Sequence, residues 1–320
     1  MKRKQLAPHI HADQPAAERY IYVCLALLPA WIAGVFYYGF RVLVLSAVSI
    51  LTFFFSDYLS TRKLYPEQAF YVDYSSIVSG LLLTLLVPVS TSVWAIFLAA
   101  LFGSLLIKQA FGGVGTNIFN PALASRMFLE FAFPSQMTVV EGPFDGLWHV
   151  TSLLTGKPAV DTPSLPDLSW SHILSGRIPS MIGTATTALI LLGMVILIER
   201  RLFHFEASLA YFATLIIGYI PCYIHSLGLR HFASWITCGG LVLIGVFMLN
   251  DCTTMPLSRR GRAFFGCGTG ILTLLMYRFG NSTYAMIFPV LMMNMTTPIF
   301  DRYIRPQAFS KSSWYREVKS

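Results

Sequence analysis

The stretch FGGVGTNIFNPALASRMFLEFAFP, residues 111–134, decides the fold because it places a polar loop and a charged helix between apolar segments. Its run of glycines permits a loose turn, since glycine adopts backbone angles that other residues avoid. Asn120 followed by Pro121 is the pattern of an N-cap residue and the first position of a helix. The stretch therefore predicts a loop that ends in a helix beginning at Pro121.

The helix predicted after Pro121 carries two ionisable residues, Arg126 and Glu130, spaced four apart and so on one face. Ionisable side chains within a membrane protein are costly and usually face the protein interior. Either the two side chains pair with each other, or Arg126 neutralises an anionic cofactor such as a flavin phosphate. The sequence leaves both alternatives open.

The composition is that of an integral membrane protein. Hydrophobic residues make up 55% of the chain, charged residues only 12%, and the mean hydropathy is +0.62. A soluble domain would carry about twice that charged fraction. The basic start MKRK is not followed directly by a short apolar region, so we expect a retained anchor rather than a cleavable signal. The five cysteines form no CxxC pair, which favours buried thiols, although a cluster ligated jointly with another subunit remains open.

We expect an all-α polytopic membrane protein of about ten transmembrane helices, because a spanning helix needs about 20 apolar residues. The fifth segment is short for a span. The candidate segments are 20–40, 41–57, 75–90, 92–108, 121–133, 180–199, 206–225, 232–249, 263–279 and 283–300.

Lysine and arginine predict the orientation, since these residues concentrate in cytoplasmic loops. Both termini are expected in the cytoplasm of a bacterial cell, on the inner side of its cytoplasmic (inner) membrane. The basic residues then assigned to the inside are Lys2, Arg3, Lys4, Arg62, Lys63, Lys108, Arg200, Arg201, Arg259, Arg260, Arg262, Arg302, Arg305 and Lys311, whereas Arg41, Lys157, Arg177 and Arg230 fall outside.

The predicted spans divide into two five-helix halves of inverted topology, an organisation found in many transporters. A cytoplasmic segment, 1–19, precedes the first half, 20–133. An extracytoplasmic loop, 134–179, separates it from the second half, 180–300, and a cytoplasmic tail, 301–320, follows.

A polar break rich in Asn and Thr follows an apolar segment in each half. The first contains Asn117 and Asn120; the second contains Asn250 and Asp251. Irregular backbone at membrane depth is tolerated only where it is buried in protein or lines a cavity. The breaks could form an ion or cofactor site, whereas simple helix-packing turns would need no such role.

Several kinds of chemistry are not supported by the sequence. The GGVGTN turn lacks the spacing and the lysine of a Walker A loop. The loop 134–179 has no His and Cys at metal spacing and no Ser-His-Asp arrangement, so neither a metal site nor a hydrolase is indicated there.

The residues resemble the D subunit of Rnf complexes and the related B subunit of sodium-pumping NADH:quinone reductase. The resemblance runs in order across nearly the whole chain, and its most specific part is the glycine–Asn–Pro stretch. The matching stretches are PHI at 8–10, LALLPAWIAGVFYYGFR from Leu25, DYSSIVSGLLLTLLVPVS from Asp73, IKQAFGGVGTNIFNPALASRMFL from Ile107, GGLVLIGVFMLNDCTTMPLSRRGR from Gly239 and NMTTPIFDRYIRP from Asn294.

The resemblance implies a flavin-binding scaffold with FMN joined through a phosphoester to a threonine of the outer loop. Thr162, in VDTPSL, is the best match to that threonine, with Thr155 and Thr151 as weaker candidates. The family's Ser-Gly-Ala lead-in is absent, so the alternatives are a flavin held without a covalent bond or a flavin that has been lost. Riboflavin or a second flavin is a further expectation.

The resemblance also implies a role, which is electron transfer between ferredoxin and NAD coupled to movement of Na⁺ or H⁺. The chain alone would catalyse nothing. The implied partners are a flavin-bearing G-type subunit, iron–sulfur B- and C-type subunits, A- and E-type membrane subunits and membrane lipid, but no nucleic acid. Arg126 and the Asn and Asp residues of the two breaks would set the flavin site. The alternatives are a secondary transporter or channel, or a cofactor-free anchor for redox partners.

Overall fold

The computed structural model describes residues 16–64, 74–138, 180–184, 187–238, 240–279 and 284–304. Every regular element within these ranges is helical, which confirms the all-α prediction for the described part of the chain. The predicted attachment residue, Thr162, lies outside the described residues.

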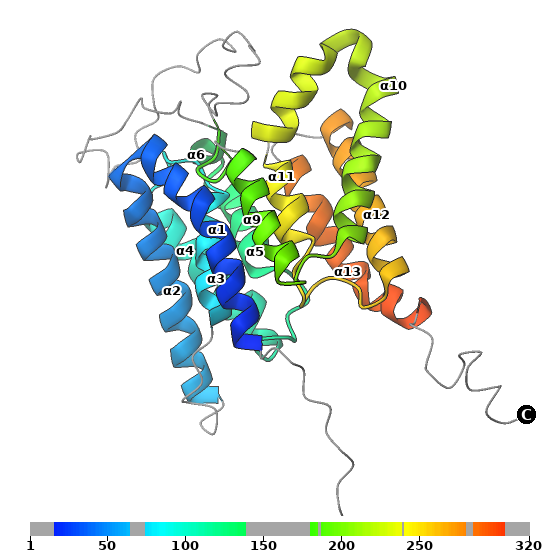
Figure 1. Ribbon diagram of the computed structural model, residues 1–320. Helices are drawn as coiled ribbons and strands as arrows, with labels where there is room; N and C mark the ends of the chain where they lie inside the picture. Colours follow the sequence, from blue (N-terminus) through cyan, green and yellow to red (C-terminus); the bar gives the residue numbers. More distant parts are fainter. Residues whose placement is uncertain are drawn as a thin grey trace, which may run out of the picture.

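The first part of the chain packs as a group of neighbouring helices (Figure 1). Gly39, in a left-handed conformation with φ of 72°, connects the first two. The elements are α1 (Ala16–Tyr38), α2 (Phe40–Leu64), α3 (Tyr74–Leu85), α4 (Val93–Phe102), the π-helix η2 (Gly103–Lys108), the 3₁₀ turn η3 (Gln109–Phe111), α5 (Pro121–Ala132) and α6 (Pro134–Thr138).

The second part packs against the first through α1 and α9, while α10 and α12 form a close pair (Figure 1). A second π-helix, η4, lies just before the second polar break. The elements are α9 (Thr187–Glu199), α10 (Phe205–Cys238), α11 (Leu241–Leu243), η4 (Ile244–Met248), α12 (Arg259–Phe279), the 3₁₀ turn η5 (Tyr284–Met286) and α13 (Phe288–Tyr303).

Among the described residues, three helices are long and apolar enough to cross a membrane, and they cover Ala17–Tyr38, Phe40–Lys63 and Val93–Phe111. The pair His231–Thr237 and Leu241–Met248, bent by 54°, adds a fourth if it is one span. Shorter apolar helices cover Tyr74–Leu85, Thr187–Glu199 and Phe205–Ile220. Ten spans in inverted halves therefore stay a prediction.

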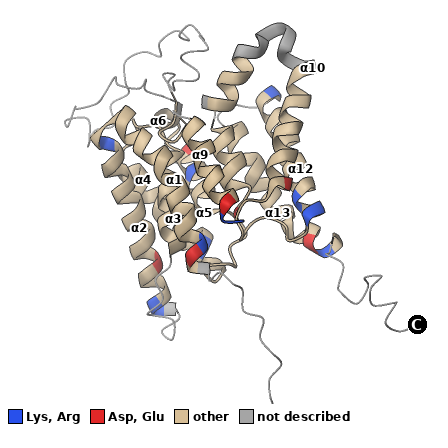
Figure 2. Cartoon of the chain, in the orientation of Figure 1, with Lys and Arg blue, Asp and Glu red and all other residues tan. Residues whose placement is uncertain are grey.

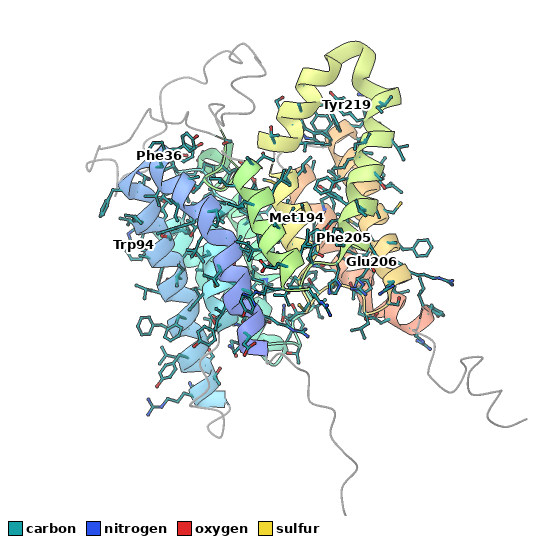
Figure 3. All side chains as sticks on the ribbon, in the orientation of Figure 1. Phe36, Trp94, Met194, Phe205, Glu206 and Tyr219 are labelled. Carbon is teal, nitrogen blue, oxygen red and sulfur yellow. The ribbon has the colours of Figure 1, made fainter. Side chains whose placement is uncertain are left out.

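Large apolar side chains point away from the protein, as expected of helices that contact lipid. Phe36 and Trp94, at the periphery of the bundle in Figure 3, are 67% and 71% exposed. Most of the coloured charged residues lie in the lower part of Figure 2, at the end of the bundle where the described chain begins and ends. This one-sided distribution agrees with the predicted clustering of Lys and Arg on one side.

Candidate functional site

The glycine-rich loop connects η3 to α5 in the way its sequence predicts. Gly112, Gly113 and Gly115 have φ angles of 110°, 91° and 87°, which favour glycine over residues with a side chain. The Asn120 side chain accepts hydrogen bonds from the backbone N–H groups of Ala122 (3.0 Å) and Leu123 (3.3 Å). The predicted N-cap at Asn120 and helix start at Pro121 are thus confirmed.

The two polar breaks meet each other directly. The side-chain amide of Asn120 donates a hydrogen bond to Asp251 Oδ2 at 3.0 Å, and the amide of Asn117 donates to Thr253 Oγ1 at 3.3 Å. These contacts join residues more than 130 positions apart, so they connect the two parts of the chain. The arrangement brings together residues of both breaks that the sequence singled out.

Asp251 is held by several donors inside this junction. Its Oδ1 accepts hydrogen bonds from the Thr253 backbone N–H (3.2 Å) and hydroxyl (3.0 Å), and Oδ2 accepts one from the Thr254 hydroxyl (3.3 Å). Burial raises the pKa of the Asp251 carboxyl, while the hydrogen bonds from Thr253, Thr254 and Asn120 oppose that rise. The loop thus builds a buried acid surrounded by neutral donors.

Asn250 anchors the second break to neighbouring elements instead of contacting the first break. Its amide donates hydrogen bonds to Ser208 Oγ and to the Val246 carbonyl, both at 2.8 Å. Its oxygen accepts a hydrogen bond from the His204 backbone N–H at 2.9 Å. Asn250 therefore fixes the position of Asp251 relative to α10 and η4.

A cavity of about 340 Å³ lies at this junction. Its wall is mostly apolar, with a polar side formed by the two breaks. The residues that line it are Arg19, Tyr20, Val23, Ser75, Val78, Ser79, Leu82, Lys108, Val114, Gly115, Asn117, Asn120, Pro121, Leu197, Leu202, Phe247, Asn250, Asp251, Cys252 and Thr253. The predicted residues Asn117, Asn120, Asn250 and Asp251 thus share one cavity.

Arg126 does not line this cavity. Its side chain is fully buried, with Nη1 at 2.7 Å from Glu130 Oε1 and Nε donating a hydrogen bond to the Leu86 carbonyl at 2.8 Å. Of the two alternatives that the sequence left open for Arg126, the contacts show the pairing with Glu130. Its predicted role toward a flavin phosphate stays a prediction.

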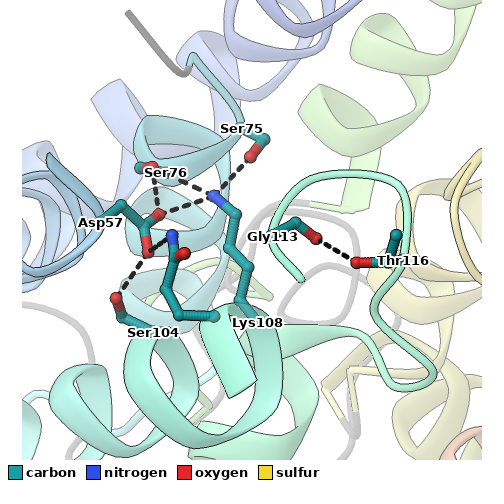
Figure 4. A network of polar contacts seen from close by, with 8 residues as sticks. Asp57, Ser75, Ser76, Ser104, Lys108, Gly113 and Thr116 are labelled. Atoms are coloured by element: carbon teal, nitrogen blue, oxygen red, sulfur yellow. Dashed lines mark hydrogen bonds and ion pairs between the residues drawn. The ribbon is translucent and has the colours of Figure 1, made fainter. Parts of the chain in front are cut away.

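A second polar network was missed by the sequence reading (Figure 4). Lys108, which the sequence assigned to the cytoplasmic side, is 2% exposed and lies 2.6 Å from Asp57 Oδ2. The side of the membrane on which it lies stays a prediction. Asp57 also accepts hydrogen bonds from Ser76, from Ser104 (2.6 Å) and from Gln109 (3.0 Å). The sequence feature that could have indicated this network is Asp57, an isolated acidic residue at the end of an apolar segment.

Metal ligation finds no support in the described ranges, where no group of three or more His, Cys, Asp or Glu side chains is placed to hold an ion. The wall of the cavity is largely apolar and carries side-chain amides, one carboxylate (Asp251), one ammonium (Lys108) and one guanidinium (Arg19). Such a combination of an apolar wall with a few convergent polar groups is typical of small-molecule binding sites.

Comparison with known proteins gives full-length matches. A model of the NQR2, RnfD, RnfE family matches residues 4–310. The D subunit of the ion-translocating oxidoreductase complex of Stutzerimonas stutzeri is 30% identical over 93% of this chain and 96% of its own length.

Two further relatives cover the chain to a similar extent. The D subunit of the Na⁺-translocating ferredoxin:NAD⁺ oxidoreductase complex of Acetobacterium woodii is 27% identical over 98% of this chain and 97% of its own length. The D subunit of the ion-translocating oxidoreductase complex of Halorhodospira halophila is 28% identical, over 95% and 94%. This chain therefore belongs to the NQR2, RnfD, RnfE family.

Proposed function

We propose that this chain is the D-type membrane subunit of an Rnf-type complex, in which it carries electrons on bound flavin between ferredoxin and NAD while Na⁺ or H⁺ moves. Full-length similarity to proteins named as the D subunit of such complexes supports the assignment. The observation that carries a cofactor role is the cavity where the two polar breaks meet. The partners would be the flavin-bearing, iron–sulfur and membrane subunits of the complex.

The cavity suits the ring system of a flavin. Its volume falls within the range of small-molecule sites, and the aromatic side chains of Tyr20 and Phe247 belong to its wall. At Gly115 no atom lies within 4 Å of where a side-chain carbon would begin, so the loop leaves room beside it. The isoalloxazine would supply the redox chemistry. Asn117, Asn120 and the apolar wall would hold the ring and exclude water.

The proposal includes two flavins. FMN at Thr162 is what the family resemblance implies, and Thr162 lies outside the described residues. The second flavin, held without a covalent bond, would occupy the cavity at the polar junction.

A second pair of similar segments supports the proposal of inverted halves. FGGVGTNIFNP (111–121) and FGNSTYAMIFP (279–289) share the Phe-Gly start and a Pro ten positions after the Phe. Each Pro lies in the first turn of a helix, α5 or α13, and these two helices run in opposite directions in Figure 1. We propose 279–289 as a second candidate for the counterpart of the first break, beside the region 250–254 that the sequence indicated.

Flavin fluorescence tests the proposal. The full chain, co-expressed with its flavin transferase, should fluoresce as a denatured band in a gel, and Thr162→Ala should remove the signal. Thr155→Ala is the matched control and should retain it. Extraction of the native Thr162→Ala protein should still release the second, non-covalent flavin. A wild type without either flavin would refute the flavoprotein role and leave the anchor or transporter.

A further inference from the structure

The ammonium of Lys108 contacts three side-chain oxygen atoms, and Lys108 also lines the cavity (Figure 4). Lys108 Nζ lies 2.6 Å from Asp57 Oδ2, 2.6 Å from Ser75 Oγ and 3.1 Å from Ser76 Oγ. The side chains of Asp57, Ser75 and Ser76 come from two different helices, α2 and α3, and all are buried. The protein thus provides a pre-formed oxygen cage around one positive charge.

The charge of this cage matches a monovalent cation. Its single carboxylate, Asp57, is balanced by one ammonium, and the other groups are hydroxyls and the Gln109 amide. A divalent ion would leave an excess positive charge at a buried position, where an unbalanced charge is costly. Hard cations prefer oxygen ligands such as the carboxylate and hydroxyl oxygens present here.

A second carboxylate, that of Asp251, lies on the wall of the cavity that Lys108 lines. Lys108 and Ser75 both line the cavity at the polar junction, and Asp251 lines it too. A lysine ammonium sits on a flexible stem of four carbons, so it can turn without movement of the backbone. A Lys108 ammonium turned into the cavity would share it with the carboxyl of Asp251 and with the guanidinium of Arg19, which also lines it.

We propose that the oxygens of Asp57, Ser75 and Ser76 form a monovalent cation site that the ammonium of Lys108 fills in this structure, and that an alkali cation and Lys108 exchange there. The site itself rests on the contacts above; only its use in ion movement rests on the proposed function. The exchange moves ions without any change of covalent bonds.

Replacing the ammonium tests the site. Lys108→Met leaves the oxygens with one unbalanced carboxylate, so the purified full-length variant should be stabilised by NaCl or KCl but not by choline chloride at equal ionic strength. At an ion concentration ten times the dissociation constant, binding multiplies the folding equilibrium constant about elevenfold. The wild type should respond less, because its own ammonium competes.

The double variant Asp57→Asn, Lys108→Met is the matched control and should show no cation effect. If folded Lys108→Met responds equally to NaCl, KCl and choline chloride, the cage is not a cation site and the ion pair serves packing alone.

A second measurement uses the wild type and needs no folded variant. Acylation of lysines by a small amine-reactive reagent, read by mass spectrometry, should label Lys108 at least twofold more in NaCl than in choline chloride. Lys63, which is exposed, should label equally in both salts. Equal labelling of Lys108 would overturn the exchange. Neither measurement involves flavin, so a failure here and a failure of the proposed function can be told apart.

Discussion

Asn120 performs two tasks at the junction of the breaks, and replacing it by alanine removes both. Its oxygen caps α5 through the N–H groups of Ala122 and Leu123, and its amide donates to Asp251. Ser92 offers a matched comparison, because it caps α4 by accepting from Ala95 N at 3.3 Å and its hydroxyl is not part of the junction.

The expected cost of Asn120→Ala follows from these contacts. Loss of an N-cap costs about 1 kcal/mol. Loss of a hydrogen bond to a charged group costs a further 1.5–3 kcal/mol, roughly. We therefore expect Asn120→Ala to lower the free energy of unfolding by about 3 kcal/mol, and Ser92→Ala by only about 1 kcal/mol.

The assay is unfolding of the purified full-length chain in detergent micelles titrated with SDS, followed by circular dichroism at a pH where Asp251 is ionised. The difference between the two variants measures the bond across the junction. Equal losses for Asn120→Ala and Ser92→Ala would refute the reasoning, since they would mean that the contact with Asp251 contributes no stability.

Two further predictions concern buried charge and pH. Glu130→Ala leaves the guanidinium of Arg126 buried without its carboxylate partner and should lower the free energy of unfolding by roughly 3–5 kcal/mol. The double variant Arg126→Met, Glu130→Leu removes both charges and should lose less stability in the same SDS titration. A double variant as unstable as Glu130→Ala would contradict this prediction. Burial, together with the nearby Arg262, lowers the pKa of the His204 imidazole in the loop before α10. The pKa of His204 in the folded protein is therefore lower than the value of about 6.5 in the unfolded chain. The stability that neutral His204 contributes is complete above a pH of about 6.5 and is lost as the pH falls through the folded pKa. His204→Gln should therefore show a smaller loss of thermal stability between pH 7.5 and pH 5.5 than the wild type, and an equal loss would exclude His204 as the cause.

The sequence predicted the local structure of the first break well, because that structure depends on neighbouring residues. The N-cap at Asn120, the helix start at Pro121 and the common face of Arg126 and Glu130 follow from rules that act over a few positions. Each of these features is present in the structure. The sequence also pointed to both breaks as polar sites.

The partners across the chain could not be predicted in the same way. The bond between Asn120 and Asp251 joins positions 131 apart, and the pair Asp57–Lys108 joins positions 51 apart. Lys108 lies just before a glycine-rich turn, where a lysine is usually exposed to solvent. It is buried because α2 and α3 pack around it. Helix packing, rather than local pattern, decides which of these charges meet.

The two π-helices have a consequence for where the residues after them face. η2 ends at Lys108, and η4 ends at Met248, shortly before Asp251. A π-turn holds one residue more than an α-turn, so the residues that follow it are rotated around the helix axis by about 100° relative to a continuous α-helix. The extra residue in η2 therefore contributes to the direction in which Lys108 points, toward Asp57, Ser75 and Ser76. Deleting one residue of η2 would turn the end of this helix away from those partners.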